Sequence, residues 1–171
     1  MRRAVTAFRN RAEAANSLDF LRSSLPAVRE ELEAAENELN QYQIGAESVD
    51  ISAEAEMLLT QMVELETRIS EREMERASIA QRFQPTHPRF QAWQTQMTDL
   101  RQRRGRLEQQ VAALPRTQQD LVRLQRSVKV SNEIYLQMLS RIQQLEVAKA
   151  GTLGSVRIID GAVTNTVAPV S

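Results

Sequence analysis

The sequence predicts a mainly α-helical fold, all-α apart from one short C-terminal β-strand, in which long antiparallel helices form an elongated arm. Three observations predict it. Gln, Glu, Arg, Ala and Leu dominate the 171 residues, only 4% of which are aromatic, and this composition is typical of long helices. Apolar residues recur at alternating spacings of three and four over four stretches, as in coiled coils. Short links that contain Gly or Pro separate these stretches.

The first helix is expected over residues 3–44. Its apolar seam consists of Leu18, Leu21, Leu25, Val28, Leu32, Ala35, Leu39 and Tyr42. The apolar residues upstream lie on a slightly shifted stripe, at Val5, Phe8, Ala12 and Ala15. Pro26 lies inside this helix and lacks a backbone N–H, so we expect it to kink or split the helix. Gly45 occupies the position where a glycine commonly follows the last helical residue.

The second helix is expected over residues 52–83, after the link 45–51. Its seam consists of Ala55, Leu58, Met62, Leu65, Ile69, Arg72, Arg76, Ile79 and Phe83, and the two arginines weaken it. The helix stops at "QPTHP" because Pro85 and Pro88 disfavour helical geometry at the residues that precede them. This segment predicts a tight turn between two helices.

The third helix is expected over residues 89–113, with a seam made of Phe90, Trp93, Met97, Leu100, Arg104, Leu107, Val111 and Leu114. Gly105 weakens it by roughly 1 kcal/mol relative to alanine. The fourth helix is expected over residues 117–149, with a seam made of Leu121, Leu124, Val128, Ser131, Tyr135, Met138, Ile142 and Leu145. Because the links are short, an up-down-up-down path is the simplest arrangement, and it places the link 45–51 and Pro115 at one pole.

The charges are balanced overall and segregated locally. Lys plus Arg and Asp plus Glu number 22 each, so the net charge is zero and no nucleic-acid partner is expected. Residues 30–66 contain 11 acidic residues and no basic one, whereas residues 101–129 are rich in arginine. We expect the two patches to pair, between helices or between subunits. The candidate contact residues are Arg101, Arg103, Arg104, Arg106, Glu30, Glu31 and Glu33.

No residue pattern predicts catalysis, a metal site or a cofactor. The chain has no Cys, and the single histidine, His87, lies between two prolines without a second His that could complete a metal site. Dense glutamate on a helix is usually a solvated face rather than a pair of catalytic carboxylates. No G-x-x-x-x-G-K-[ST] loop is present to bind a nucleotide phosphate. We therefore expect no enzymatic activity from this segment.

The C-terminal segment differs from the rest of the chain. The run "SVRIIDGAV" carries Val156, Ile158 and Ile159 between two glycines, which predicts a strand after a helical region that ends near Ala150. A lone strand is unstable, and no other stretch predicts one, so its partners would have to come from elsewhere. We therefore divide the chain into a helical arm, residues 1–150, and a strand with a tail, residues 151–171. The sequence contains neither an 18-residue apolar run nor a signal peptide, so any export signal would have to lie in a flanking segment.

This tail resembles the C-terminal signature of the bacterial polysaccharide co-polymerases, the chain-length determinants of the Wzz and Wzc type, in which a helix ends in "KAGTVGNVRIID". The matching signature positions are Gly151, Gly154, Ser155, Val156, Arg157, Ile158, Ile159 and Asp160. Two positions differ, because Leu153 replaces a valine and Ser155 replaces the asparagine. Elsewhere, "RFQPTHPRF" resembles the family's "RYTPEHP" turn and "LPRTQQDL" its "LPKTEQE" helix. The subgroup resembled most is that of the exopolysaccharide proteins.

The resemblance implies a periplasmic segment inserted between two transmembrane helices of an inner-membrane protein. Several copies would assemble into a ring around the growing polysaccharide, and residues 155–162 would form a strand of an α/β base domain. The implied function is regulation of the chain length or export of exopolysaccharide or capsular polysaccharide, alongside a fused or separate cytoplasmic tyrosine autokinase. The expected partners are further copies of the chain, a polysaccharide polymerase, an outer-membrane export protein and the polysaccharide itself. Membrane attachment would come only from the flanking segments.

Some alternatives stay open at this point. The arginines of residues 101–106 could contact an acidic polysaccharide, although a solvated or ion-paired helix face is more common. Trp93 and Phe90 could stack on sugar rings, although their spacing favours packing in the core. The rival functions are a periplasmic adaptor hairpin of an efflux or secretion system, which would need flanking lipoyl-like β segments, and a cytoplasmic coiled-coil scaffold.

Overall fold

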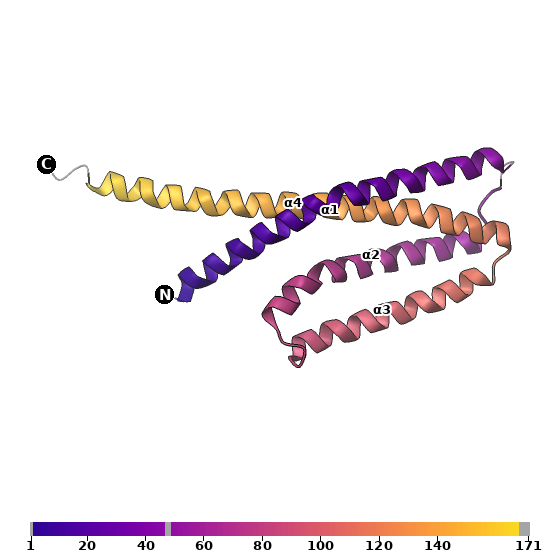
Figure 1. Cartoon of the computed structure of the whole chain (residues 1–171), viewed down its shortest axis with the longest axis horizontal. Helices are drawn as coiled ribbons and strands as arrows, with labels where there is room; N and C mark the ends of the chain where they lie inside the picture. The colour runs from indigo at the N-terminus through magenta and orange to yellow at the C-terminus, as the bar shows by residue number, and fades with distance from the viewer. Residues whose placement is uncertain (1, 47–48, 168–171) are drawn as a thin grey trace. The chain divides into compact units, whose positions relative to one another are not determined.

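The computed structural model describes residues 2–46 and 49–167, with the side chains of residues 2, 4, 6–10 and 152–167 left outside the description. Four helices follow one another: α1 (Arg2–Gly45), α2 (Ala53–Arg82), α3 (Pro88–Ala112) and α4 (Arg116–Val167) (Figure 1). No strand occurs within the described ranges. The predicted all-α fold is therefore confirmed, whereas the division into an arm and a tail at residue 150 stays a prediction.

Local chemistry accounts for where the helices begin and end. Ser52 caps α2, and its Oγ accepts a hydrogen bond from the backbone N–H of Ala55 at 3.2 Å. His87 caps α3 in the same way, with Nδ1 accepting from the N–H of Arg89 at 3.1 Å, and Pro88 is the first helical residue. Gly45 is the last residue of α1 rather than the residue after it. The bounds of the first three helices lie within one residue of those expected.

Pro26 does not split α1, which continues as one helix from Arg2 to Gly45. A proline inside a helix removes one hydrogen bond and crowds the preceding turn, at a cost of about 3 kcal/mol. The apolar seam on both sides of Pro26 favours continuation of the helix, because Leu21 and Ala35 are both buried. Of the two expected effects, a split of the helix is contradicted, and a kink at Pro26 stays a prediction.

The predicted C-terminal strand is also wrong for this chain. Residues 151–167, including the segment 155–162, continue α4 instead of ending it near Ala150. The physical reason is that a strand needs hydrogen-bonding partners from other strands, and no other stretch of this sequence predicts a strand. A helix satisfies its backbone N–H and C=O groups within one segment.

The chain divides into two compact units. In the unit formed by residues 1–25 and 138–171, seam residues of α1 and α4 are buried, namely Leu18, Leu21, Met138 and Ile142. An ion pair between Arg22 and Glu146 joins the two helices. The shifted stripe expected upstream does not form a seam among the described side chains, because Val5, Ala12 and Ala15 are exposed. Phe8 lies outside the described side chains.

In the unit formed by residues 26–137, one core cluster joins α2, the link between α3 and α4, and α4 itself. Its buried members are Ala55, Leu58, Leu59, Met62, Leu114 and Val122. Leu59 and Val122 are both 1% exposed, yet neither lies on a predicted seam. They are buried because α2 packs against α4 as well as against α3, so its apolar face is wider than a two-helix seam.

A second cluster in the same unit holds the α2–α3 hairpin together. It consists of Leu65 and Ile69 of α2 with Trp93 and Met97 of α3, and the hairpin is visible in Figure 1 as the magenta and pink helices. At 1.5 Å per residue, the 30 residues of α2 span roughly 45 Å. Every apolar residue of the predicted α3 seam is buried or half-buried, and the seam prediction for this helix is confirmed.

Gly105 offers a simple test of helix propensity inside α3. A Cβ atom at this position would meet no atom within 4 Å, and the glycine lies in the interior of the helix. Replacing Gly105 with Ala is expected to raise the free energy of unfolding by about 1 kcal/mol, because alanine loses less backbone entropy on folding. Urea unfolding followed by circular dichroism measures it. Unchanged or lower stability would contradict the finding that an added Cβ atom meets no neighbour at this position.

Candidate functional site

The acidic and basic stretches meet within one chain, in the unit of residues 26–137. Arg123 of α4 lies 3.2 Å from Glu38 of α1, and Arg126 of α4 lies 3.9 Å from Glu66 of α2. The Arg126 and Glu66 side chains are only 26% and 20% exposed, so water screens this pair less than the other. α4 therefore carries the basic partners for two different helices. Intrachain pairing accounts for part of the charge pattern.

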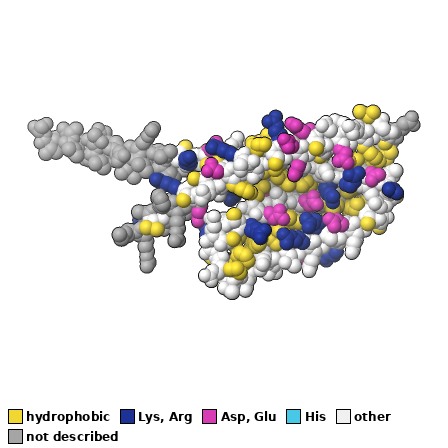
Figure 2. Space-filling model, viewed as in Figure 1, with side chains coloured by type: hydrophobic (Ala, Val, Ile, Leu, Met, Phe, Trp, Pro, Cys, Tyr) yellow, Lys and Arg dark blue, Asp and Glu magenta, His cyan; other side chains and the backbone are white. Residues whose placement is uncertain are grey.

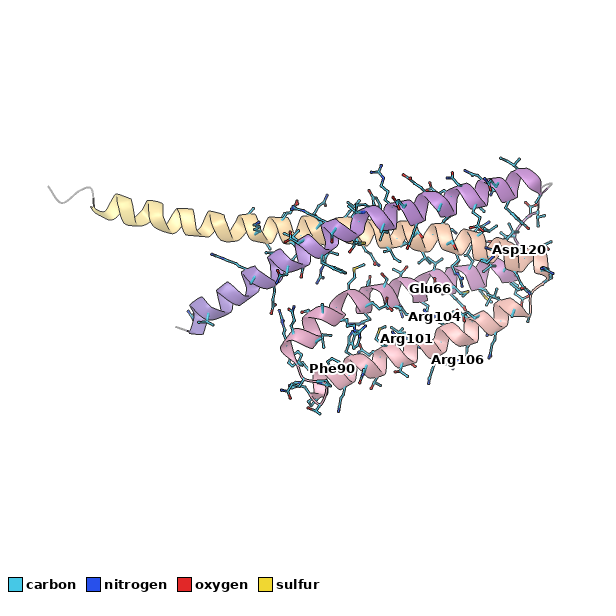
Figure 3. All side chains as sticks on the ribbon, viewed as in Figure 1. Glu66, Phe90, Arg101, Arg104, Arg106 and Asp120 are labelled. Carbon is cyan, nitrogen blue, oxygen red and sulfur yellow. The ribbon has the colours of Figure 1, made fainter. Side chains whose placement is uncertain are left out.

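The predicted contact residues behave differently from one another. Arg101 pairs across helices with Glu73 of α2 at 3.8 Å, whereas Arg103 and Arg104 pair within α3, with Asp99 and Glu108. Figure 3 marks Arg101, Arg104 and Arg106 along α3 and Glu66 on α2. Of the predicted glutamates, Glu33 pairs with Arg29 in its own helix, and Glu30 and Glu31 are exposed. Sequence spacing identified the charged faces and not the individual partners.

An open groove of about 310 Å³ lies between α2 and α3. It combines an apolar floor with charged walls, and its lining residues are Gln61, Glu64, Leu65, Arg68, Arg103, Arg106 and Leu107. In Figure 2, basic side chains and apolar side chains lie next to each other over this part of the molecule. Arg68 was not among the predicted candidates. The available signal was its position as the first basic residue after the acidic stretch, three residues beyond the seam residue Leu65.

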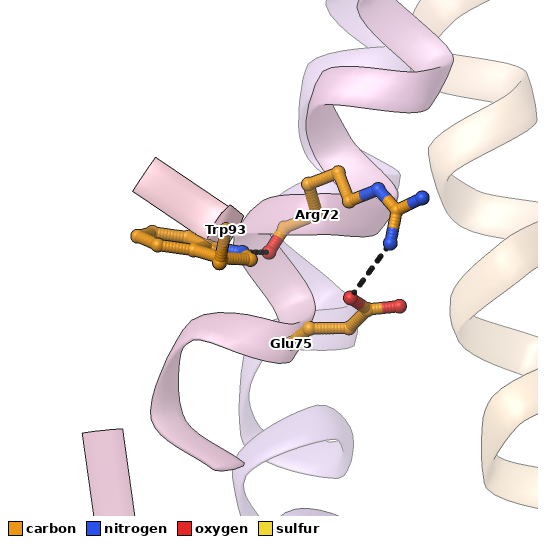
Figure 4. A network of polar contacts seen from close by, with 3 residues as sticks. All are labelled: Arg72, Glu75 and Trp93. Carbon is orange, nitrogen blue, oxygen red and sulfur yellow. Dashed lines mark hydrogen bonds and ion pairs between the residues drawn. The ribbon is translucent and has the colours of Figure 1, made fainter. Parts of the chain in front are cut away.

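Trp93 belongs to the core, in agreement with the interpretation that its spacing favoured. Its side chain is 9% exposed, and its Nε1–H donates a hydrogen bond to the backbone oxygen of Arg72 at 2.9 Å (Figure 4). Arg72 is exposed and pairs with Glu75 at 3.2 Å, so this seam arginine contributes its backbone to the packing and not its charge. Phe90 lies beside Trp93, with ring centroids 6.0 Å apart. The Trp93 indole is therefore not available as a platform for a sugar ring.

Gln118, in the first turn of α4, bonds to the link between α1 and α2. The up-down-up-down path was expected to bring this link and Pro115 to the same pole. The Gln118 Oε1 accepts a hydrogen bond from the N–H of Ser52 at 2.9 Å, and its Nε2 donates to the backbone oxygen of Asp50 at 3.0 Å. The neighbouring Gln119 donates to the backbone oxygens of Ala112 and Leu114. Two glutamines at the start of α4 thus satisfy backbone groups in the link before α2, at the end of α3 and in the link after it.

Replacing Gln118 with Ala is expected to lower the free energy of unfolding by about 1–2 kcal/mol, because two backbone groups lose their partner. Gln118→Glu provides the matched control, since the carboxylate keeps a charge-assisted acceptor for Ser52 and replaces the donor for Asp50 with a second acceptor. Denaturant unfolding should place the glutamate variant between the wild type and the alanine variant. Equal stability of all three proteins would show that water replaces both bonds without loss.

The histidine has a structural role, which the lack of a second His or of any Cys in the chain had favoured. Besides capping α3, the His87 ring packs on Phe83 with centroids 4.4 Å apart, and the Arg89 guanidinium lies 5.5 Å from the centre of the Phe83 ring. Among the described residues, no group of three or more His, Cys, Asp or Glu side chains is placed to hold a metal ion. The turn between α2 and α3 is therefore organised by ring packing and capping.

The signature residues lie at the end of α4. Gly151 is exposed and helical, and residues 154–160 are helical in their backbone, with side chains outside the described set. The structural role of the remaining signature residues therefore stays a prediction. These residues are Gly154, Ser155, Val156, Arg157, Ile158, Ile159 and Asp160. The described part of the chain contains no helix that is both long enough and apolar enough to cross a bilayer.

Packed helices joined by apolar clusters and intrachain ion pairs define the class of this chain as a helical segment. Comparison with known proteins makes this class specific. Residues 116–171 match the family model described as "G-rich domain on putative tyrosine kinase". Over most of its length the chain is similar to Wzc- and Etk-type tyrosine-protein kinases, the polysaccharide co-polymerase family, and it corresponds to one segment of them.

Three relatives illustrate the match. The chain is 41% identical to the tyrosine-protein kinase etk of Escherichia coli strain K12 over 156 residues, which cover 91% of this chain and 22% of that protein. The tyrosine-protein kinase wzc of Salmonella typhi is 38% identical over 152 residues, covering 89% of this chain and 21% of that protein. The protein of the same name from Salmonella typhimurium is 37% identical over 156 residues, covering 91% of this chain and 22% of that protein. The chain thus spans about a fifth of the length of these relatives.

Proposed function

We propose that this chain is the periplasmic helical segment of an inner-membrane polysaccharide co-polymerase and that it regulates the length or export of an exopolysaccharide or capsular polysaccharide. The segment acts by binding and assembly rather than by chemistry. In the full-length protein, it assembles with further copies of itself and contacts the polymer and the proteins that make and export it. A tyrosine kinase activity, if the parent has one, belongs to other parts of that protein.

The observation that carries this proposal is identity of 37–41% to Etk- and Wzc-type proteins over about nine-tenths of the chain. Because 156 of the 171 residues are aligned, the similarity includes most of the helical region. The three relatives named above are tyrosine-protein kinases by name, so the rival adaptor function gains no support from them. The rival cytoplasmic scaffold gains no support either, because such a scaffold would have no use for the G-rich domain whose family model residues 116–171 match.

The structure supports a role as a preorganised scaffold. In the unit of residues 26–137, two apolar clusters and the Gln118 bridge hold the α2–α3 hairpin and the start of α4 in one arrangement. A surface built on packed helices presents its side chains at defined positions, which lowers the entropy lost on binding. This property suits a segment that must contact other chains or a polymer repeatedly.

The direct test is removal of the arm from the full-length protein. Deleting residues 3–150 should change the size distribution of the polymer on a gel, or the amount exported, in cells whose protein level is matched by immunoblot. A sharper version compares Leu59→Ala, which removes a buried side chain, with Met57→Ala, which removes one that is 54% exposed. Polymer size should change with the first variant and not with the second. Unchanged product size and export after the deletion would refute the proposal.

A further inference from the structure

We propose that the groove between α2 and α3 binds the carboxylate-bearing sugars of an acidic polysaccharide. This inference rests on the proposed function and names the class of polymer that the segment recognises. The groove lies wholly within the unit of residues 26–137, between two helices that a buried cluster holds together. Its geometry is therefore set by packing that the ligand does not have to create.

The charges of the groove are available for an anionic ligand. In the described part of the chain, Arg68 and Arg106 make no hydrogen bond or ion pair, whereas Arg103 is paired with Asp99 at 3.2 Å. Glu64 is the single acidic residue in the lining, so the groove has an excess of positive charge. A guanidinium presents a planar fork of donors that matches a carboxylate in bidentate geometry. Arg68 from α2 and Arg106 from α3 thus offer anion contacts from two helices.

The floor of the groove suits a sugar ring. Leu65, which is 7% exposed, and Leu107 provide apolar surface between the arginines, and Gln61 adds an amide that can donate and accept hydrogen bonds. A hexuronate combines an apolar C–H face with hydroxyl groups and one carboxylate. The volume of about 310 Å³ is at the lower end of the range for small-ligand sites, about 300–1,000 Å³. Because the groove is open, neighbouring sugars of a chain can continue beyond it.

An acidic helix from a second copy of the chain fits the same charges less well. A helix with its side chains is about 10–12 Å wide, and a stable protein interface buries about 800 Å² on each partner. A hollow of about 310 Å³ accommodates a few side chains and not a helix of that width. The size of the groove therefore favours a polymer one sugar wide.

The test uses the 171-residue chain, a tetramer of glucuronate, and a neutral glucose tetramer of matched length, with binding measured by calorimetry at low salt. We expect the glucuronate tetramer to bind and the neutral tetramer not to bind. Glucuronate monomer at the same carboxylate concentration should bind more weakly than the tetramer, which separates a polymer site from a site for any small anion. The double variant Arg68→Gln/Arg106→Gln should lose about tenfold or more in affinity, since each charge-assisted contact contributes substantially.

The matched control is Arg116→Gln/Arg141→Gln, which removes two exposed arginines outside the groove and changes the net charge equally. Its affinity should fall by less than about twofold, because salt screens distant exposed charges. Thermal melting followed by circular dichroism verifies that both double variants fold. Equal losses in the two variants would overturn the proposal in favour of diffuse charge attraction. Absence of glucuronate binding, or equal binding of the neutral tetramer, would also overturn it.

Sedimentation of the same proteins tests whether a second copy of the chain occupies the groove instead of the polysaccharide. If Arg68→Gln/Arg106→Gln abolishes self-association and leaves glucuronate binding unchanged, the groove faces another chain and the inference fails. The experiments also distinguish a failure of the groove to bind glucuronate from a failure of the arm to regulate the polymer. A groove that binds no glucuronate, together with a change of polymer size in Leu59→Ala and none in Met57→Ala, would leave the arm as a length regulator without this site.

Discussion

Replacing Leu59 with alanine lowers the free energy of unfolding by about 2–5 kcal/mol, the expected cost of removing a large side chain from a packed core. Leu59 is 1% exposed and belongs to the cluster that joins α2 to Val122 of α4. Removing its three terminal carbons leaves a cavity whose walls belong to several helices and cannot close without moving them. Urea unfolding followed by circular dichroism should show a lower midpoint.

Met57 provides the matched control for this result. It lies two residues earlier in the same helix, and its side chain is 54% exposed. Replacing Met57 with alanine should change stability by no more than about 0.5 kcal/mol, as is usual for surface positions. Similar destabilisation by both substitutions would contradict the described orientation of α2, because the two residues would then be equally buried.

Replacing Trp93 with alanine is expected to lower the free energy of unfolding by about 3–5 kcal/mol. Trp93 is the largest side chain in the cluster that holds α2 against α3, and its indole also donates a hydrogen bond to Arg72 (Figure 4). Loss of the ring leaves Leu65, Ile69 and Met97 without their common neighbour. The two helices of the hairpin then lose most of the apolar contact near the turn.

Trp93→Phe separates packing from hydrogen bonding in the same position. Phenylalanine keeps a ring in the cluster and removes the N–H donor, so we expect a smaller loss of about 1 kcal/mol. Because Trp93 is the only tryptophan, its fluorescence in the wild-type chain reports its burial independently. Emission typical of a water-exposed indole, or equal stability of the phenylalanine and alanine variants, would show that the ring does not belong to the core.

Much of the fold was predictable because helix periodicity is a local property. The seam of α3 was predicted residue by residue, and Pro85 and Pro88 predicted the turn that precedes this helix. The strand at residues 155–162 was not predicted correctly, because β-branched residues favour a strand only where partner strands exist. The stripe at Val5, Ala12 and Ala15 failed for a related reason, since apolar spacing does not specify whether another helix covers the stripe.

The candidate site was predictable only in part. The arginines of α3 were identified from their density in the sequence, yet Arg68 lies about 40 residues away in the chain and reaches the groove only because α2 folds back on α3. The acidic and basic stretches were expected to pair. Which residues pair depended on helix rotation, which placed Glu38 and Glu66 beside α4 and left Glu30 and Glu31 exposed.

The bounds of the first three helices and the turn between α2 and α3 follow from residue order alone, since each depends on contacts over a few residues. The similarity to the relatives follows from it as well. The choice of neighbours does not follow from it. α2 and α4 advance in the same direction, as the successive contacts of Glu66 with Arg126 and Glu71 with Gln137 show, although short links suggested antiparallel neighbours. That pairing buries Leu59 and Val122 in one cluster, and burial of apolar area is a property of the assembled helices.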